Sequence, residues 1–183
     1  MNAECHSDVQ QIRDGAEAFN VTVVEANQTS GRLEASAAQY FKADLPIVGI
    51  GHSIGAVTLL ALAGGEAQTL AGDTVMSGPT LKFDRLALFA PPTDFFRRSG
   101  ALKSVRVPIR IWVGAKDSIT PPAQAQFLKE VLSLQGPIDI CLDEEAGHFS
   151  YMDELPPNIT DSHSNRSKFL ASLANDVGRF VVA

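Results

Sequence analysis

The sequence contains only two cysteines, Cys5 and Cys141, among its 183 residues. Two cysteines can form at most one disulfide, which excludes a small fold held together by several disulfides. No apolar run approaches the roughly 18 residues that a membrane-spanning helix needs, and the N-terminus lacks the apolar core of a signal peptide. We therefore expect a cytoplasmic protein that does not associate with a membrane.

Positive charge is also scarce. The chain has 15 Lys and Arg against 21 Asp and Glu, a formal net charge of −6, and no basic block. Nucleic acid is therefore not an expected partner. The hydrophobic fraction of 45% and the charged fraction of 20% are ordinary for a globular protein. The length fits one well-buried domain better than two, so we expect a single domain over residues 1–183.

The signatures of several enzyme classes are missing as well. The sequence has no Walker A motif, no H-E-x-x-H and no C-x-x-C. Gly49 and Gly51 begin a pattern like the dinucleotide fingerprint G-x-G-x-x-G, but the third glycine falls one place late, at Gly55. We therefore expect no cofactor and no metal.

The most informative motif that is present is G-x-S-x-G, written G-H-S-I-G at residues 51–55. An apolar run at 45–50 precedes it, and a helix-friendly apolar run at 56–63 follows. In this strand–turn–helix context the motif forms a nucleophile elbow, which lifts the serine hydroxyl above a sheet. The helix N-terminus beneath it favours developing negative charge. Ser53 is therefore the candidate nucleophile, and an ordinary turn serine is the competing interpretation.

Two further apolar runs lead to possible partners of this serine. Residues 107–114 lead to Asp117, and residues 138–142 lead to His148. Each candidate follows the carboxyl end of an expected strand, which is where open α/β sheets place their sites. His148 would accept the serine proton and later protonate the leaving group, and Asp117 would orient the imidazole. The competing interpretation of His148 is a surface-loop histidine.

These motifs, in this order, resemble the α/β-hydrolase superfamily. Residues 51–55 match its elbow, G-A-K-D-S-I-T-P at 114–121 its acid loop, and A-G-H-F at 146–149 its histidine loop. The acid loop and residues 148–151 also look somewhat like the dienelactone-hydrolase-like esterases, although the nucleophile here is serine and not cysteine. The resemblance runs from about Phe19 to the C-terminus. It implies a serine hydrolase that cleaves a small-molecule carboxylic ester or thioester through an acyl-enzyme intermediate.

The identity of the acid has an alternative. Asp94 follows the expected strand 85–90, and the end of that strand would also open on the site. We favour Asp117 because residues 118–121 after it match the acid loop of the family. Asp143, Glu144 and Glu145 are expected to form a solvated loop face.

The apolar pattern alternates strands with helices, which predicts a parallel sheet covered by helices on both faces. We expect an α/β three-layer sandwich with a mostly parallel sheet of about five strands, a minimal α/β-hydrolase fold. Thr120 is expected to cap a helix that begins at Pro121. The glycines Gly64, Gly65 and Gly72 indicate a loose connection after the elbow helix. Residues 95–104 are expected to form a short helix or a cap-like loop over the site. The expected strands, in sheet order, are 21–26, 47–51, 85–90, 108–114 and 138–142, and the other expected helices are 7–19, 32–42 and a C-terminal helix with an apolar stripe from Phe169 to Val181.

The sequence departs from the family ahead of the elbow. α/β-Hydrolases usually have several strands and a His-Gly-type oxyanion loop there, whereas we expect one strand and find no His-Gly pair. Either the protein is a minimal version or this chain lacks its natural N-terminus. The 21–26 strand should then pair directly with 47–51, since an unfilled gap would leave backbone groups unpaired. The backbone N–H of Asn27 or Gln28 could then join that of Ile54 as oxyanion donors.

Aromatic and apolar residues near the expected site are candidates for an acyl pocket, with plain packing as an equal alternative. The sequence does not predict the oligomeric state. A second hypothesis is an N-terminally truncated or non-catalytic hydrolase-fold protein that binds a ligand or partner, because fold alone does not decide function. The pocket candidates are Phe95, Phe96, Phe149, Tyr151 and Met152.

Overall fold

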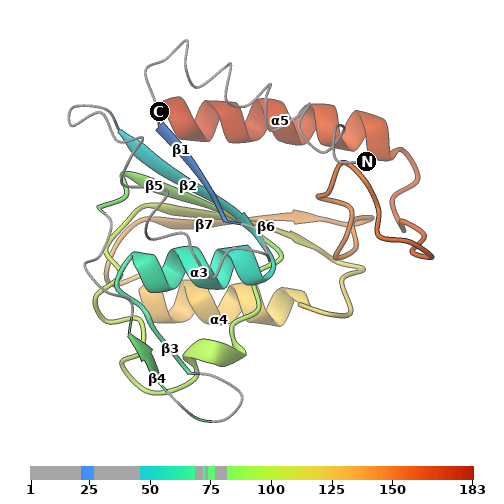
Figure 1. The fold of residues 1–183 in the computed structure, drawn as a ribbon. Helices are drawn as coiled ribbons and strands as arrows, with labels where there is room; N and C mark the ends of the chain where they lie inside the picture. Colours follow the sequence, from blue (N-terminus) through green and yellow to red (C-terminus); the bar gives the residue numbers. More distant parts are fainter. Residues whose placement is uncertain (1–21, 27–45, 69–71, 73, 77–81) are drawn as a thin grey trace.

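The structure, a computed structural model, describes residues 22–26, 46–68, 72, 74–76 and 82–183. The expected helices 7–19 and 32–42, as well as Asn27 and Gln28, lie outside the described residues, which Figure 1 draws as a thin grey trace. The described elements, in chain order, are β1 (Thr22–Ala26), β2 (Ile47–His52), α3 (Ile54–Leu62), β3 (Glu66–Gln68), β4 (Thr74–Met76), β5 (Arg85–Phe89), the 3₁₀ helix η1 (Asp94–Phe96), β6 (Ile109–Gly114), α4 (Pro122–Leu132), β7 (Ile138–Asp143) and α5 (Arg166–Val182).

Five of these strands form one sheet in the order β1-β2-β5-β6-β7, and every pairing in it is parallel. This confirms the expected strand order. The register between the first two strands runs from Thr22 opposite Ile47 to Ala26 opposite Gly51. The direct pairing of β1 with β2 is therefore confirmed as well.

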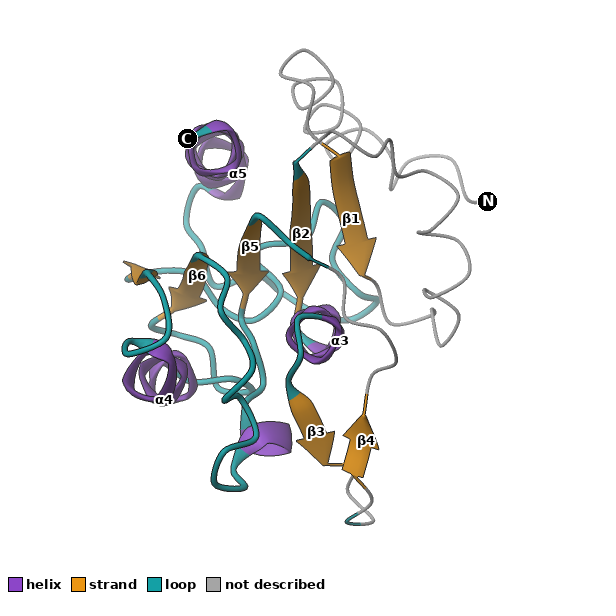
Figure 2. Cartoon of the chain, turned by 90° about the vertical axis from the view of Figure 1, so that its left-hand side faces the viewer, coloured by secondary structure: helices purple, strands orange, loops and turns teal. Residues whose placement is uncertain are grey.

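The helices cover both faces of this sheet. Helix α5 lies on one face, and α3 and α4 lie side by side on the other (Figures 1 and 2). The protein is therefore a three-layer α/β sandwich, as expected. No helix among the described residues is both long enough and apolar enough to cross a membrane.

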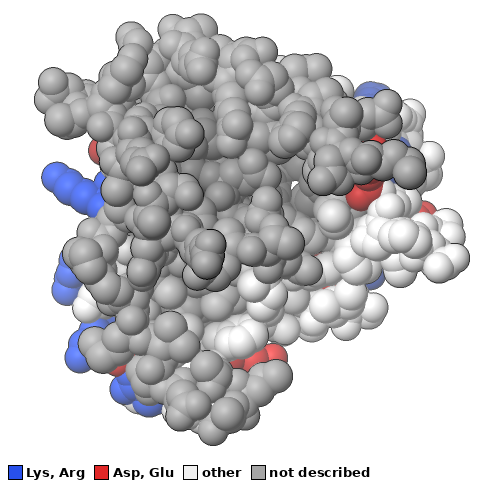
Figure 3. All heavy atoms as spheres, in the orientation of Figure 1, with Lys and Arg blue, Asp and Glu red and all other residues white. Residues whose placement is uncertain are grey.

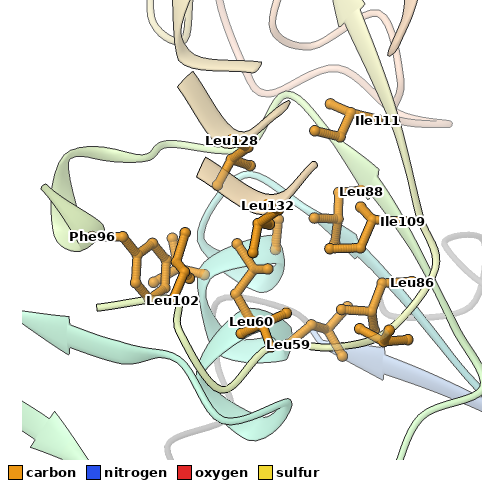
Figure 4. Packing of buried hydrophobic residues seen from close by; sticks show 14 of the residues in the cluster. Leu59, Leu60, Leu86, Leu88, Phe96, Leu102, Ile109, Ile111, Leu128 and Leu132 are labelled. Carbon is orange, nitrogen blue, oxygen red and sulfur yellow. The ribbon is translucent and has the colours of Figure 1, made fainter. Parts of the chain in front are cut away.

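Two hydrophobic clusters hold the layers together. The larger one lies between the sheet and the α3–α4 layer; Figure 4 shows leucines of both helices packed against leucine and isoleucine side chains of β5 and β6. The smaller one lies between the sheet and α5, where Trp112 contacts Phe180 edge-on at 6.1 Å between ring centroids. Because the middle strands are buried on both faces, their sequences are nearly continuous apolar runs. In β5, for example, Leu86, Ala87 and Leu88 are all 0% exposed.

Three connections differ from the expectation. The loose connection after α3 contains an antiparallel pair, β3 with β4. The segment expected as a short helix or a cap-like loop over the site does begin with a short helix, η1, but its Phe96 and Leu102 are buried in the larger hydrophobic cluster, so this part packs into the core. Helix α4 begins at Pro122 and has Pro121 as its N-cap with no side-chain capping bond, so Thr120 is not its cap.

The described surface carries both signs of charge. In the face shown in Figure 3, Lys and Arg side chains stand mainly along one margin, and Asp and Glu side chains appear in small separate groups. Two exposed arginines are paired with acids: Arg97 Nε lies 3.1 Å from Asp94 Oδ1, and Arg98 pairs with Glu66.

Candidate active site

The site begins at the turn between β2 and α3. Ser53 has φ 52° and ψ −121°, which places a non-glycine residue in the left-handed region at a cost in strain. A Cβ on Gly51 would lie 2.8 Å from the carbonyl carbon and oxygen of Gly55, so the turn needs a glycine at that position. The backbone N–H of Ser53 donates to the Phe89 carbonyl oxygen at 2.9 Å, which ties the turn to β5. This strained strand–turn–helix is the geometry of a nucleophile elbow.

The three residues that the motifs predicted lie together at the carboxyl edge of the sheet. His148 Nε2 is 3.0 Å from Ser53 Oγ, and His148 Nδ1 is 2.9 Å from Asp117 Oδ2. All three residues are buried, with exposed fractions of 7% for Ser53, 8% for His148 and 3% for Asp117. The carboxylate can only accept, so in the neutral imidazole Nδ1 carries the proton and Nε2 faces the serine hydroxyl as an acceptor. This is the arrangement in which an imidazole can take a proton from serine.

Asp117 is held by the loop that follows β6. Its Oδ1 accepts hydrogen bonds from the backbone N–H groups of Ile119 and Thr120, at 2.9 and 2.7 Å, and its Oδ2 accepts from the Thr120 hydroxyl at 2.7 Å. Burial opposes ionisation of this carboxyl, but the hydrogen bonds from His148 and Thr120 outweigh it and hold the pKa of Asp117 below its usual value. Asp117 is therefore ionised at neutral pH and orients the imidazole.

The alternative acid lies elsewhere. The Asp94 side chain is 72% exposed and pairs with Arg97 three residues later. The contact predicted between Asp117 and His148 is the one that the structure contains.

The acid loop and the histidine loop are in close contact. The Lys116 N–H donates to the Ala146 carbonyl oxygen at 3.1 Å, and the Ala115 N–H donates to the Asp143 carbonyl oxygen at 2.8 Å. Asp143 Oδ1 in turn accepts from the backbone N–H groups of Glu145 and Ala146, both at 2.8 Å. The Asp143 side chain is 35% exposed, as a solvated loop face would be, but its carboxylate also organises the turn that leads to His148.

His52 supports the site in a way that the sequence did not predict. Its Nε2 lies 2.8 Å from the backbone carbonyl oxygen of His148, and the two rings lie 4.9 Å apart between centroids. Burial lowers the pKa of His52 to about 4, so its ring is neutral at neutral pH and Nε2 donates to the carbonyl. The one indication of this role in the sequence was the position of His52, directly before Ser53 at the end of β2.

The expected oxyanion donors are only partly within the described residues. Ile54 is the first residue of α3, and the first N–H groups of a helix have no partner within it. Its N–H is thus available at the turn beside Ser53. Asn27 and Gln28 lie outside the described residues, so the source of a second donor stays a prediction.

The expected pocket residues separate into two groups. Phe149 lies beside the triad, with its ring edge-on to His148 at 5.0 Å between centroids, and Met152 is half-buried in the same turn, where its N–H donates to the Phe149 carbonyl oxygen at 3.1 Å. Two further apolar side chains beside the triad are open to solvent, Ile54 at 38% and Ile119 at 54% exposed.

The other three expected pocket residues take part in packing. Phe96 is 1% exposed in the larger core cluster, and Phe95 packs against that cluster. Tyr151 is partly buried and packs against the smaller cluster, 5.7 Å from Phe89 between ring centroids. A ring buried to this extent cannot contact a ligand without moving, so the expectation of an open pocket wall is not met for Phe96.

The described residues offer no evident metal site. Within them, no group of three or more His, Cys, Asp and Glu side chains is arranged to hold a metal ion. Cys141, half-buried in β7, is a free cysteine, and burial raises the pKa of its thiol.

The comparisons with known proteins bear on the fold. No family model and no curated protein matches the chain. Among solved structures, a truncated carbohydrate esterase from gut microbiota is similar to it, with 16% identity and a TM-score of 0.51 over 93% of this chain and 67% of that one. Esterase 2 of Thermogutta terrifontis matches at 18% identity and a TM-score of 0.46, and an alpha-beta serine hydrolase homologue from Coxiella burnetii at 19% and 0.47.

The matched regions cover only part of these proteins. They include 72% of this chain and 53% of the Thermogutta esterase, and 75% of this chain and 50% of the Coxiella homologue. The chain thus spans about half the length of those two structures. The dienelactone-hydrolase-like branch stays a prediction. At these identities the likeness concerns the fold, and together with the parallel sheet and the elbow it shows that this chain has an α/β-hydrolase fold.

Proposed function

We propose that the protein is a serine hydrolase that cleaves a small-molecule carboxylic ester or thioester through an acyl-enzyme intermediate. The observation that carries the proposal is the buried chain of hydrogen bonds from Ser53 through His148 to Asp117, with the serine on a strained elbow. Strain of this kind persists where the surrounding structure imposes it, and it is concentrated at functional sites.

In the first half-reaction, Ser53 Oγ attacks the acyl carbon as its proton moves to His148 Nε2. The Oδ2 of Asp117 stabilises the resulting imidazolium through Nδ1–H. The negative charge that develops on the carbonyl oxygen is stabilised by the Ile54 N–H at the N-terminus of α3. The tetrahedral intermediate then expels the alcohol or thiol, which takes the proton from Nε2.

In the second half-reaction, water replaces the leaving group. His148 Nε2 removes a proton from the water as its oxygen attacks the acyl carbon, and Ser53 Oγ departs with that proton. The products are a carboxylic acid and the regenerated serine. No cofactor is needed for either step, because the nucleophile and the proton carrier are both side chains. We also propose a cytoplasmic location, with which the low cysteine content is consistent.

The proposal is tested by turnover of short-chain p-nitrophenyl esters by the 183-residue chain. We expect turnover that falls to the buffer rate in Ser53→Ala and is retained in Ser118→Ala, the matched control. Ser118 is an exposed serine next to Asp117 in the acid loop. A folded wild type without turnover would favour a hydrolase-fold protein that binds a ligand or partner. Turnover unchanged in Ser53→Ala would show that another group carries the reaction.

A further inference from the structure

The Thr120 hydroxyl lies inside the candidate site, although the sequence predicted that it would cap α4. The residue is 2% exposed. Its Oγ1 lies 2.7 Å from Asp117 Oδ2, 3.0 Å from His148 Nδ1 and 3.2 Å from the Ala90 carbonyl oxygen. One hydroxyl thus contacts both the acid and the imidazole of the triad.

The direction of these hydrogen bonds follows from counting protons. A hydroxyl has one proton to donate, and both Asp117 Oδ2 and the Ala90 carbonyl can only accept. The carboxylate oxygen is charged and nearer, so it receives the proton. A lone pair of Oγ1 is then free to accept from His148 Nδ1–H, which is also 2.9 Å from Asp117 Oδ2. The imidazole N–H is therefore shared between two oxygens.

The surrounding backbone fixes the hydroxyl in this place. The Thr120 N–H is bonded to Asp117 Oδ1, so main chain and side chain of one residue bind the two oxygens of the same carboxylate. On its other side, Ala90 has φ 46°, in the left-handed region that favours glycine, and its carbonyl oxygen contacts the hydroxyl. Neither oxygen of the Asp117 carboxylate can rotate away without losing a bond to Thr120.

We propose that Thr120 is a positioning residue of the hydrolase, which rests on the function proposed above. Its hydroxyl orients the Asp117 carboxylate and gives His148 Nδ1–H a second acceptor. Both effects matter most when the imidazole is protonated during attack and departure, because an oriented carboxylate and two acceptors stabilise that cation. The hydroxyl acts through Asp117 and His148 and does not touch the substrate.

The test compares Thr120→Val with Thr120→Ser in the 183-residue chain. Valine keeps the shape and the backbone N–H bond to Asp117 but deletes the hydroxyl, whereas serine retains the hydroxyl. We expect kcat for a p-nitrophenyl ester to fall about 10-fold to 100-fold in the valine variant, as for a lost hydrogen bond to a charged group, with KM unchanged. The serine variant should stay within a few-fold of the wild type.

A second measurement does not require turnover. The His148 Nδ1–H, hydrogen-bonded to a carboxylate, should give a downfield proton resonance in NMR spectra, to be assigned by its absence in His148→Phe. Thr120→Val removes the hydroxyl that both competes for the Nδ1–H and donates to Asp117 Oδ2. The bond from Nδ1–H to Asp117 should therefore strengthen, and its resonance should move further downfield. In Thr120→Ser it should stay at the wild-type position.

Unchanged kcat together with an unmoved resonance in Thr120→Val would overturn the proposal. A Thr120→Ser variant as impaired as Thr120→Val would also overturn it, because that result would indicate a packing role alone. A wild type that turns over no ester would instead contradict the proposed function. In that case the resonance still decides separately whether Thr120 sets the bond between His148 and Asp117.

Discussion

Replacing Gly114 by alanine would place a methyl group against the backbone of the histidine loop. Gly114 is the last residue of β6, and a Cβ built on it would lie 2.0 Å from the Ala146 carbonyl oxygen and 2.4 Å from the carbonyl carbon. Ordinary van der Waals contact begins at 3.4 Å, so the two segments would have to separate by about 1.4 Å. Both neighbouring atoms are backbone and cannot turn aside as the end of a side chain can.

That separation would displace residues of the triad. Ala146 is two residues before His148, and Gly114 is three before Asp117, so separating the loops stretches the 2.9 Å bond from His148 Nδ1 to Asp117 Oδ2. A misplacement of about 1 Å costs on the order of 10²-fold in rate. Overpacking of this kind also lowers the free energy of unfolding by about 1–3 kcal/mol. We expect losses of this size in kcat/KM and in stability.

The assay measures ester turnover and urea unfolding of Gly114→Ala beside the matched control Gly178→Ala. A Cβ on Gly178 meets nothing within 4 Å, and the residue lies inside α5, where alanine is favoured over glycine by about 1 kcal/mol. The control should therefore keep full activity and gain slightly in stability. A Gly114→Ala protein as active and as stable as the wild type would show that the two loops do not approach each other as described.

Two other predictions concern the acid and His52. Asp117→Asn should lower kcat by about 10⁴-fold, because asparagine stabilises the wrong imidazole tautomer. Asp94→Asn should leave kcat unchanged. The opposite ranking of the two variants in a turnover assay would reassign the acid. For His52, burial lowers the folded-state pKa to about 4 from 6.5, so the unfolded state binds its proton first as the pH falls. The free energy of unfolding should therefore decrease between pH 6.5 and 4, by about 3 kcal/mol from this residue, and His52→Gln should lose that part of the slope in urea titrations. An equally steep slope in the variant would contradict the assignment.

The order of the sheet could be predicted from the sequence because buried parallel strands are continuous apolar runs. The runs at 47–51, 85–90 and 108–114 become β2, β5 and β6, with bounds shifted by a residue or so. The triad residues follow the ends of such strands, and parallel strands end at one edge of the sheet. The topology therefore brings Ser53, Asp117 and His148 together without any information on side chains.

The supporting residues could not be predicted in this way, because their roles depend on the direction of a side chain after folding. Thr120 precedes two prolines at a helix start, a pattern typical of an N-cap, yet its hydroxyl points back to Asp117. Asp143 is one of three consecutive acids, and its carboxylate turns inward to two backbone N–H groups. Phe96 lies in a segment without a regular apolar pattern, so the sequence did not show whether its ring lies in the core or lines a pocket.

The central claim is that Ser53 is a nucleophile activated by His148. The most direct measurement is to incubate the 183-residue chain with a fluorophosphonate and to map the adduct by mass spectrometry of its peptides. We predict a single adduct, on Ser53, that is absent in Ser53→Ala and forms far more slowly in His148→Gln. A folded chain that carries no adduct, or one whose adduct on Ser53 forms equally fast without His148, would contradict the claim.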